Sequence, residues 1–261
     1  MFYFFSAIYT LTKRELVRYI RDRARIFSTF IQPLMFLAIF GLGLRSTLTQ
    51  GNFGIDFIKF MYPGIIAMSV MGIAFFSTVS TVWDREFGFL KEILVAPVPR
   101  IAIVIGKILG AMTIASIQAL ILLVLAPFIG VSVSVTVIIE LFLFFLILSF
   151  AISGLGLLIA SLMKTTESFG VVMQVLIFPM FFLSGAFFPL TSVPAWMEWL
   201  SKINPLTYGV DAARQILLGP QTPSAVLQKL SLYPIHIDIL ALLVISAITV
   251  SAAVWAFNRR D

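Results

Sequence analysis

The sequence predicts an all-α polytopic membrane protein with about six transmembrane helices. Of its 261 residues, 60% are hydrophobic and only 11% are charged, whereas a soluble domain averages about 25% charged residues. The apolar residues are gathered into six runs, and the lysines and arginines between the runs are divided unequally between two sides. Both properties are typical of a chain whose solvent is lipid, and they exclude an ordinary soluble enzyme domain.

Each apolar run is about long enough to cross the roughly 30 Å of hydrocarbon in a bilayer as a helix. The six runs cover residues 26–44, 61–82, 108–126, 137–163, 169–188 and 239–257. No run carries a charge at its centre, and Glu140 lies near one end of the fourth. Pro179 lies inside the fifth run and predicts a kink there. We therefore expect a single membrane domain over residues 26–257.

The positive charges give the orientation. Thirteen of the 18 lysines and arginines lie on the side that holds both termini, and five lie on the other side. Cytoplasmic loops carry the excess of Lys and Arg. We therefore expect a multi-pass protein of the inner membrane with both termini in the cytoplasm. Residues 258–261 then form a short cytoplasmic tail.

Residues 1–25 are predicted to form an amphipathic helix on the cytoplasmic membrane surface. Arg14, Arg18, Arg21 and Arg25 recur along one helical face, which we expect to point towards lipid phosphates. The alternative is that these charges only orient the protein. The apolar start precedes the basic cluster, the reverse of the order in a cleaved signal peptide.

The most informative cytoplasmic stretch is the loop of residues 83–107. Phe87, Leu90 and Leu94 have the spacing of one helical face, and the prolines that follow end the predicted short helix. Apolar residues on such a helix need a packing surface. From the spacing alone, that surface can be a partner protein, the membrane or the chain's own helices.

The opposite side carries a helical hairpin over residues 187–220, too polar and too broken by prolines to be another span. We expect one short helix over residues 194–203 and a second over 205–218. Trp196 and Trp199 favour a place at the membrane interface. Packing alone is the alternative role.

Two stretches, one on each predicted side, carry a resemblance to a known family. The first is REFGFLKEILVAPVPR at residues 85–100, followed by the pair Gly106-Lys107. The second comprises FLSGAFFPL at 182–190, PAW at 194–196 and NPLTYGVDAAR at 204–214. Together they resemble the ABC-2 type transporter permease family, which includes drug-export permeases such as the daunorubicin-resistance membrane subunit. The match at Phe89-Leu90 is approximate, because the family often has Gly-Thr there.

The resemblance implies the transmembrane permease subunit of an ATP-binding cassette exporter, with two partners. One is an ABC ATPase subunit, in two copies, docked on the cytoplasmic loop. The residues implied at or near that contact are Glu86, Phe87, Leu90, Lys91 and Arg100. The other is a second, identical permease chain. ATP and magnesium would bind in the ATPase, and this chain would bind no cofactor of its own.

The resemblance also implies a translocation pathway at the dimer interface, lined mainly by the second and fifth spans. The implied lining residues are Phe75, Phe76, Met173, Phe178, Phe181 and Phe182. The outer signature segment contains Asn204, Pro205, Tyr208, Asp211 and Arg214. Asp211 and Arg214 have the i, i+3 spacing of a helical pair, which we interpret as a structural brace rather than a substrate contact.

Several sequence patterns are absent. The chain has no cysteine and a single histidine, His236, so a Cys- or multi-His metal site is excluded. No phosphate-binding loop, nucleophile elbow or metalloprotease motif occurs. We therefore expect no enzyme activity, and energy supplied by a partner.

The expected cargo is a hydrophobic or amphiphilic drug-like compound, because the implied pathway is apolar. An ABC-2 exporter of lipid-linked polysaccharide or lipid is the first alternative. An ion-coupled secondary carrier is disfavoured because the span centres lack ionisable groups. A membrane scaffold and an intramembrane enzyme are the remaining classes.

Overall fold

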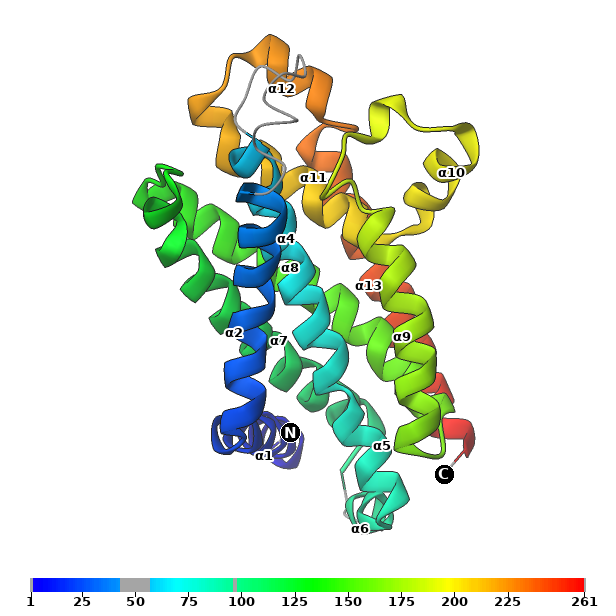
Figure 1. The fold of residues 1–261 in the computed structure, drawn as a ribbon. Coiled ribbons are helices and arrows are strands. Elements are labelled where there is room, and N and C mark those ends of the chain that lie inside the picture. The colour runs from blue at the N-terminus through cyan, green and yellow to red at the C-terminus, as the bar shows by residue number, and fades with distance from the viewer. Residues whose placement is uncertain (1, 43–56, 96–97, 261) are drawn as a thin grey trace.

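The computed structural model describes residues 2–42, 57–95 and 98–260 (Figure 1). Every regular element in these residues is a helix, and none of them forms a strand. The predicted all-α polytopic class is therefore confirmed.

The helices follow one another in a simple order. They are α1 (Phe2–Arg21), α2 (Arg23–Phe36), η1 (Leu37–Leu42), α4 (Phe57–Ser77), α5 (Val79–Glu86), α6 (Phe89–Val95), α7 (Arg100–Leu125), η2 (Ala126–Ile129), α8 (Val135–Leu162), α9 (Thr166–Phe182), η3 (Leu190–Ser192), α10 (Ala195–Ile203), α11 (Pro205–Leu218), η4 (Gly219–Gln221), α12 (Ser224–Leu230) and α13 (Ile235–Arg260).

Among the described residues, four helical segments are long and apolar enough to cross a membrane. They are Phe57–Glu86, Arg100–Phe128, Val135–Leu162 and Ile235–Asn258. These segments contain the cores of the second, third, fourth and sixth predicted runs, and each begins two or more residues before its run. The helices extend beyond the apolar runs and carry charged residues there, such as Asp84 after the second run and Arg100 before the third.

The first and fifth predicted runs are less regular. The fifth is the 17-residue helix α9, which contains Pro179 and ends at Phe182 rather than at residue 188. The first corresponds to α2 and η1, in which Pro33 interrupts the pattern of backbone hydrogen-bond donors. Its last residues, 43–44, lie outside the described residues. The total of six spans stays a prediction.

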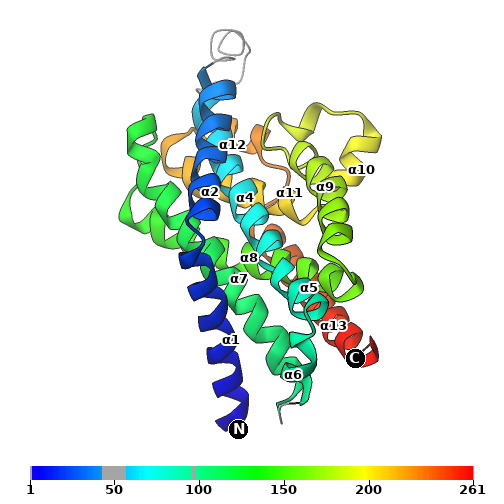
Figure 2. The ribbon, with the colours of Figure 1, turned by 60° about the horizontal axis from the view of Figure 1, so that its bottom comes forward.

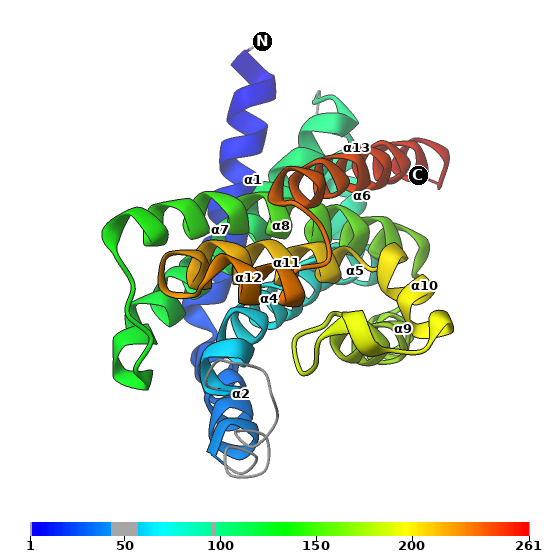
Figure 3. The same cartoon turned by 90° about the horizontal axis from the view of Figure 1, so that it is seen from above.

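The spans form a bundle around α4, with short helices at both ends. α8 and α13 pack side by side along their lengths, and α7 and α4 complete the bundle (Figures 1 and 3). α1 lies across one end of the bundle, the end that also holds α6 and the C-terminus. Figure 2 shows this end turned towards the viewer. α10, α11 and α12 lie at the opposite end.

The outer hairpin has the predicted form. α10 begins after Pro194, and α11 begins at Pro205 and ends at Leu218, followed by the 3₁₀ turn that starts at Gly219. Asn204 joins the two helices and caps α11 by accepting a hydrogen bond from the backbone N–H of Leu206. α11 is almost entirely buried against α4, α8 and α13.

Close packing at this end depends on glycine. A Cβ atom added at Gly64 in α4 would lie 2.7 Å from the Cβ of Ala186 and 2.8 Å from its Cα. The obstruction is backbone of the segment between α9 and α10, which a side-chain rotation cannot relieve. A Cβ atom added at Gly72, two turns further along the same helix, would have no atom of the described residues within 4 Å, apart from its own stretch of helix.

Gly64→Val is therefore expected to lower the melting temperature of the detergent-solubilised protein by about 5 °C or more, because overpacking against backbone forces helices apart. Gly72→Val adds the same side chain to the same helix and serves as the control, with a much smaller change. Thermal unfolding followed by intrinsic fluorescence measures both. Equal shifts for the two variants would contradict the proposed packing.

Candidate functional site

Four charged side chains from α1, α5 and α7 meet at the end of the bundle that holds the termini. The Asp84 carboxylate lies at their centre, with Lys107 Nζ at 2.6 Å and the Arg14 guanidinium at 2.5 Å from the same oxygen. Glu15 Oε1 lies 3.1 Å from Arg14 and 3.8 Å from Lys107. Asp84, Lys107 and Glu15 are buried. We call these four residues the charge cluster; its formal charges balance, as buried charges require.

Arg14 and Glu15 reach the charge cluster because α1 lies directly on α7. A Cβ atom at Gly106 would meet Leu11 at 3.0 Å, and one at Gly110 would meet Glu15 at 2.8 Å. The Thr12 hydroxyl also donates to the Gly106 carbonyl at 3.1 Å. The Gly106-Lys107 pair thus has a physical explanation: the glycine admits α1, and the lysine neutralises the acids that α1 and α5 bring.

The predicted direction of the basic face is wrong for three arginines, Arg14 and Arg18 in α1 and Arg25 at the start of α2. Arg14 binds Asp84, the Arg18 guanidinium lies 5.4 Å from the Trp83 ring centre, and Arg25 donates to the Ser77 hydroxyl. These side chains turn towards α4 and α5, where acidic, aromatic and hydroxyl groups receive them. Burial lowers the pKa of Arg14, but Asp84 and Glu15 raise it by more, so the pKa stays above its usual value.

The exposed face of α1 is instead partly apolar. It presents Phe5, Tyr9, Val17 and Ile20 to the surroundings, while Arg21 is exposed beside them. A helix with this pattern has an apolar face to lay on lipid. Its location at the membrane surface stays a prediction, with a contact face different from the expected one.

The short helix predicted in the cytoplasmic loop exists, but it begins later than expected. Phe87 lies after α5, and Gly88 adopts a positive φ of 79° that ends the helical path before α6 begins at Phe89. Phe87 and Leu90 therefore do not share one helical face, and the predicted spacing argument is wrong at this point. Phe87 is 80% exposed.

Leu90 points back into the chain. It is buried with Val104, Ile108, Leu157 and Phe257, from α7, α8 and α13. The spacing left a partner protein, the membrane and the chain's own helices open as packing surfaces. Leu90 packs on the chain's own helices. The side chains of Lys91 and Leu94 lie outside the described part of the structure.

Two more of the implied docking residues bind backbone groups of this chain. Glu86 accepts hydrogen bonds from the backbone N–H and the hydroxyl of Thr166, at 3.0 Å and 2.5 Å. The Arg100 guanidinium donates to the Phe257 carbonyl at 2.6 Å, near the end of α13. As contacts of an ATPase, Glu86 and Arg100 stay predictions.

The implied pathway residues separate into two groups. Phe75 and Met173 are fully buried and pack in the main core. Phe76, Phe178 and Phe182 are 51%, 62% and 43% exposed, so they face outwards on α4 and α9. Phe181 is partly buried against the core. Only the outward-facing residues are placed to line a pathway between two chains, and that role stays a prediction.

The outer signature segment is held by its own polar side chains. Asn204 donates to the Met180 carbonyl at 2.9 Å, next to the end of α9. Pro205 takes the first position of α11, where the missing N–H is harmless. The Tyr208 hydroxyl donates to the Lys202 carbonyl at 2.6 Å. These bonds connect α9, α10 and α11.

Asp211 and Arg214 do not pair with each other as the helical spacing suggested. Asp211 accepts hydrogen bonds from the backbone N–H groups of Leu232 and Tyr233. Arg214 donates to the Gly185 carbonyl at 2.6 Å, and its guanidinium lies over the Phe60 ring. Each side chain thus fixes a different loop.

Burial lowers the pKa of Arg214 to about 10, against a smaller opposing effect of Asp211. Arg214 therefore keeps its charge at neutral pH and can hold both Gly185 and the face of Phe60.

One member of this network was not recognised in the sequence. Gln215 Nε2 lies 3.4 Å from Asp211 and 3.2 Å from Asp238, and it joins the carboxylates of α11 and α13. Asp238, at the start of α13, is fully buried. The sequence signal that could have revealed this network is Asp238, a carboxylate at the edge of an otherwise apolar run.

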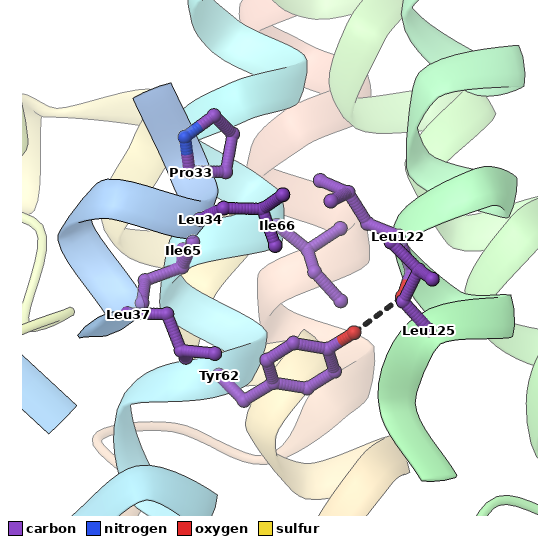
Figure 4. Close-up of a pocket in the computed structure, with 8 residues that line it drawn as sticks. All are labelled: Pro33, Leu34, Leu37, Tyr62, Ile65, Ile66, Leu122 and Leu125. Atoms are coloured by element: carbon purple, nitrogen blue, oxygen red, sulfur yellow. Dashed lines mark hydrogen bonds between the residues drawn. The ribbon is translucent and has the colours of Figure 1, made fainter. Parts of the chain in front are cut away.

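A cavity between α2, α4 and α7 is lined only by apolar side chains and Tyr62 (Figure 4). It measures about 10 Å³, the size of one water molecule. The Tyr62 hydroxyl donates to the Leu122 carbonyl beside it. The cavity is too small for a substrate.

Lys107→Met is expected to lower the melting temperature by about 6 °C or more, because it leaves buried carboxylates with too little positive charge. Lys202→Met is the matched control. Its lysine pairs with Glu198 at 2.7 Å, but both side chains are nearly half exposed, and exposed pairs contribute little. Thermal unfolding of both variants checks this. A stable Lys107→Met protein would contradict the structural role of the charge cluster.

The sequence of this chain is similar to those of several transport permeases. The chain is 30% identical over 216 residues to ycf38 of Cyanophora paradoxa, described as a transport permease, covering 82% of this chain and 74% of that one. It is 33% identical over 210 residues to the multidrug ABC transporter permease YbhR of Escherichia coli, covering 80% of this chain and 55% of YbhR.

Nodulation protein J of Rhizobium leguminosarum is 26% identical over 233 residues, covering 88% of this chain and 86% of that relative. The family model described as ABC-2 type transporter matches residues 6–218, from α1 through α11. The match includes the charge cluster, the cytoplasmic loop and the outer signature segment. The chain therefore belongs to the ABC-2 type transporter family, as a membrane permease.

Proposed function

We propose that this permease is the transmembrane subunit of an ABC exporter, and that a separate ATPase subunit drives it by docking on α6 and the turn before it. The observation that carries the proposal is Phe87, an aromatic side chain 80% exposed at the end of the bundle where both termini lie. A large apolar residue at such a site favours a protein partner. Phe89 and Val95, at the two ends of α6, are exposed as well.

The charge cluster and Leu90 support this assignment, because they attach α5 and α6 to the membrane-spanning helices. Asp84 connects the end of α5 to α1 and α7, and Leu90 connects α6 to α7, α8 and α13. A force on α6 therefore reaches the spans instead of bending a loose loop. In this proposal ATP and magnesium bind in the ATPase subunits, whose approach moves α6 and shifts the spans between inward-open and outward-open states.

The proposed pathway lies between two permease chains. The outward faces of α4 and α9 carry Phe76, Phe178 and Phe182, which suit a hydrophobic or amphiphilic drug-like compound. The similarity to YbhR, whose description includes multidrug transport, supports the same class.

The proposed location is the inner membrane with both termini in the cytoplasm. Both termini lie at one end of the bundle (Figure 1), the side to which the sequence assigns 13 of its 18 lysines and arginines. α6 lies at that same end, where a cytoplasmic ATPase can reach it.

Phe87→Ala is expected to weaken binding of the partner ATPase to the permease by about tenfold, the effect of truncating an aromatic contact at the centre of an interface. Phe128→Ala is the matched control, since Phe128 is 85% exposed beyond the other end of α7. Binding is measured by biolayer interferometry with both permease variants in nanodiscs.

The control is expected to bind the ATPase as the unmodified permease does. Wild-type affinity for Phe87→Ala, or an equal loss for Phe128→Ala, would contradict docking on this turn.

A further inference from the structure

Two consecutive residues at the end of α5 hold the turn between α8 and α9. The Arg85 guanidinium donates to the carbonyls of Ala160, Ser161 and Met163, at 3.2, 2.9 and 2.8 Å. Ala160 and Ser161 belong to the last turn of α8, and Met163 directly follows that helix. Carbonyls at a helix end lack the usual donor four residues further on, so they can accept from a side chain. A positive charge is also favoured there by the helix dipole.

Glu86 makes the complementary contact at the start of α9. It accepts hydrogen bonds from the first backbone N–H of that helix, at Thr166, and from the Thr166 hydroxyl. The N–H of Ser168, two residues further on, donates to the Thr165 hydroxyl, which caps the helix. A negative charge is favoured at a helix start. Arg85 and Glu86 therefore place opposite charges on the two helix ends that suit them.

α9 has few other attachments. Val171, Val175, Phe178 and Phe182 are exposed on its outer face. A single stripe packs inwards, comprising Phe169, Met173, Ile177 and Met180. At the far end, Asn204 and Thr207 donate to the carbonyls of Met180 and Leu183. α9 is thus a rod held by polar contacts at both ends, and Glu86 holds the end nearest α6.

The other end of the connection is rigid. Asp84, two residues before Glu86, is fixed by Lys107 and Arg14. α5 and α9 lie side by side near the end of the bundle that carries α6 (Figures 1 and 2). Glu86 belongs to α5, which is joined to α6 through Phe87 and Gly88. A displacement of α6 that carries the end of α5 with it therefore either moves the start of α9 or breaks the Glu86–Thr166 contact.

We propose that Arg85 and Glu86 form a clamp that transmits displacement of α6 to α9. Glu86 is then a positioning residue inside the permease rather than a contact of the ATPase. The clamp rests on the proposed function, since it needs an ATPase that moves α6. It explains why a carboxylate at the docking loop is turned towards Thr166 rather than outwards.

The test follows the two ends of the clamp separately and needs no transported substrate. The chain has no cysteine, so Val95→Cys on α6 and Val175→Cys on α9 each give one labelling site. Both positions are highly exposed. Each permease is labelled with bimane before its ATPase is added, and emission is compared in nanodiscs without nucleotide and with ATP plus vanadate.

With Glu86 present, nucleotide is expected to change the emission of both reporters. In Glu86→Ala the α6 change is retained, and the α9 change falls by about fivefold, because both charge-assisted hydrogen bonds from Thr166 are lost. Thr166→Val keeps the backbone N–H and loses the hydroxyl donor, so its α9 change falls less. Thr166→Val also provides the test if Glu86→Ala does not fold.

Glu167→Ala is the matched control. Glu167 is an exposed carboxylate in the first turn of α9, so it shares the helix-dipole effect of Glu86. It lies on α9 itself and therefore cannot replace the connection to α5. The control is expected to keep both emission changes.

Four results would overturn the clamp. Loss of both changes in Glu86→Ala would make Glu86 an ATPase contact. An unreduced α9 change in Glu86→Ala, or no α9 change in the unmodified permease, would show that α9 does not follow α6 through this contact. An equal loss in Glu167→Ala would assign the effect to the helix end alone. No α6 change in the unmodified permease would instead contradict the proposed function, and the clamp with it.

Discussion

Burial of Asp84 is the constraint on which the end of the bundle that carries α1 and α6 depends. A carboxylate removed from water needs positive partners, and Lys107 and Arg14 supply them from α7 and α1. Because α1 must lie on α7 to bring Arg14, the helix surface there carries glycine at Gly106 and Gly110. One buried charge thus fixes the position of the amino-terminal helix, the end of α5 and the first turns of α7.

The same region connects the proposed docking surface to the rest of the bundle. Leu90 anchors α6 in an apolar cluster, while Glu86 reaches the start of α9. At the opposite end Asn204 and Arg214 hold the loops around α9 and α11 through backbone carbonyls. The charged side chains described above therefore lie at the two ends of the bundle, where they organise loops. The span centres are packed mainly by apolar residues, with a few uncharged polar side chains such as Gln118 and Ser149. This distribution suits a transporter whose energy enters from outside the membrane domain.

The sequence predicted what depends on local pattern. Apolar runs located the four long spans, and the prolines at 194 and 205 located α10 and α11. It failed where a distant partner decides. The spacing of Arg14 and Arg18 showed that they share a face, but not that Asp84 and Trp83 would receive them.

Local conformation caused another error. The spacing of Phe87 and Leu90 suggested one helix, but the positive φ of Gly88 separates them. The docking role of Glu86 stays a prediction, and the sequence pattern gave no sign of its partner Thr166, which is 80 residues away.

The charge cluster implies that α1, α5 and α7 move as one body. A cryo-EM comparison of the permease–ATPase complex without nucleotide and with bound ATP tests it most directly. We predict that Asp84 stays within hydrogen-bond distance of both Lys107 and Arg14 in both states; loss of either contact in one state would contradict the account.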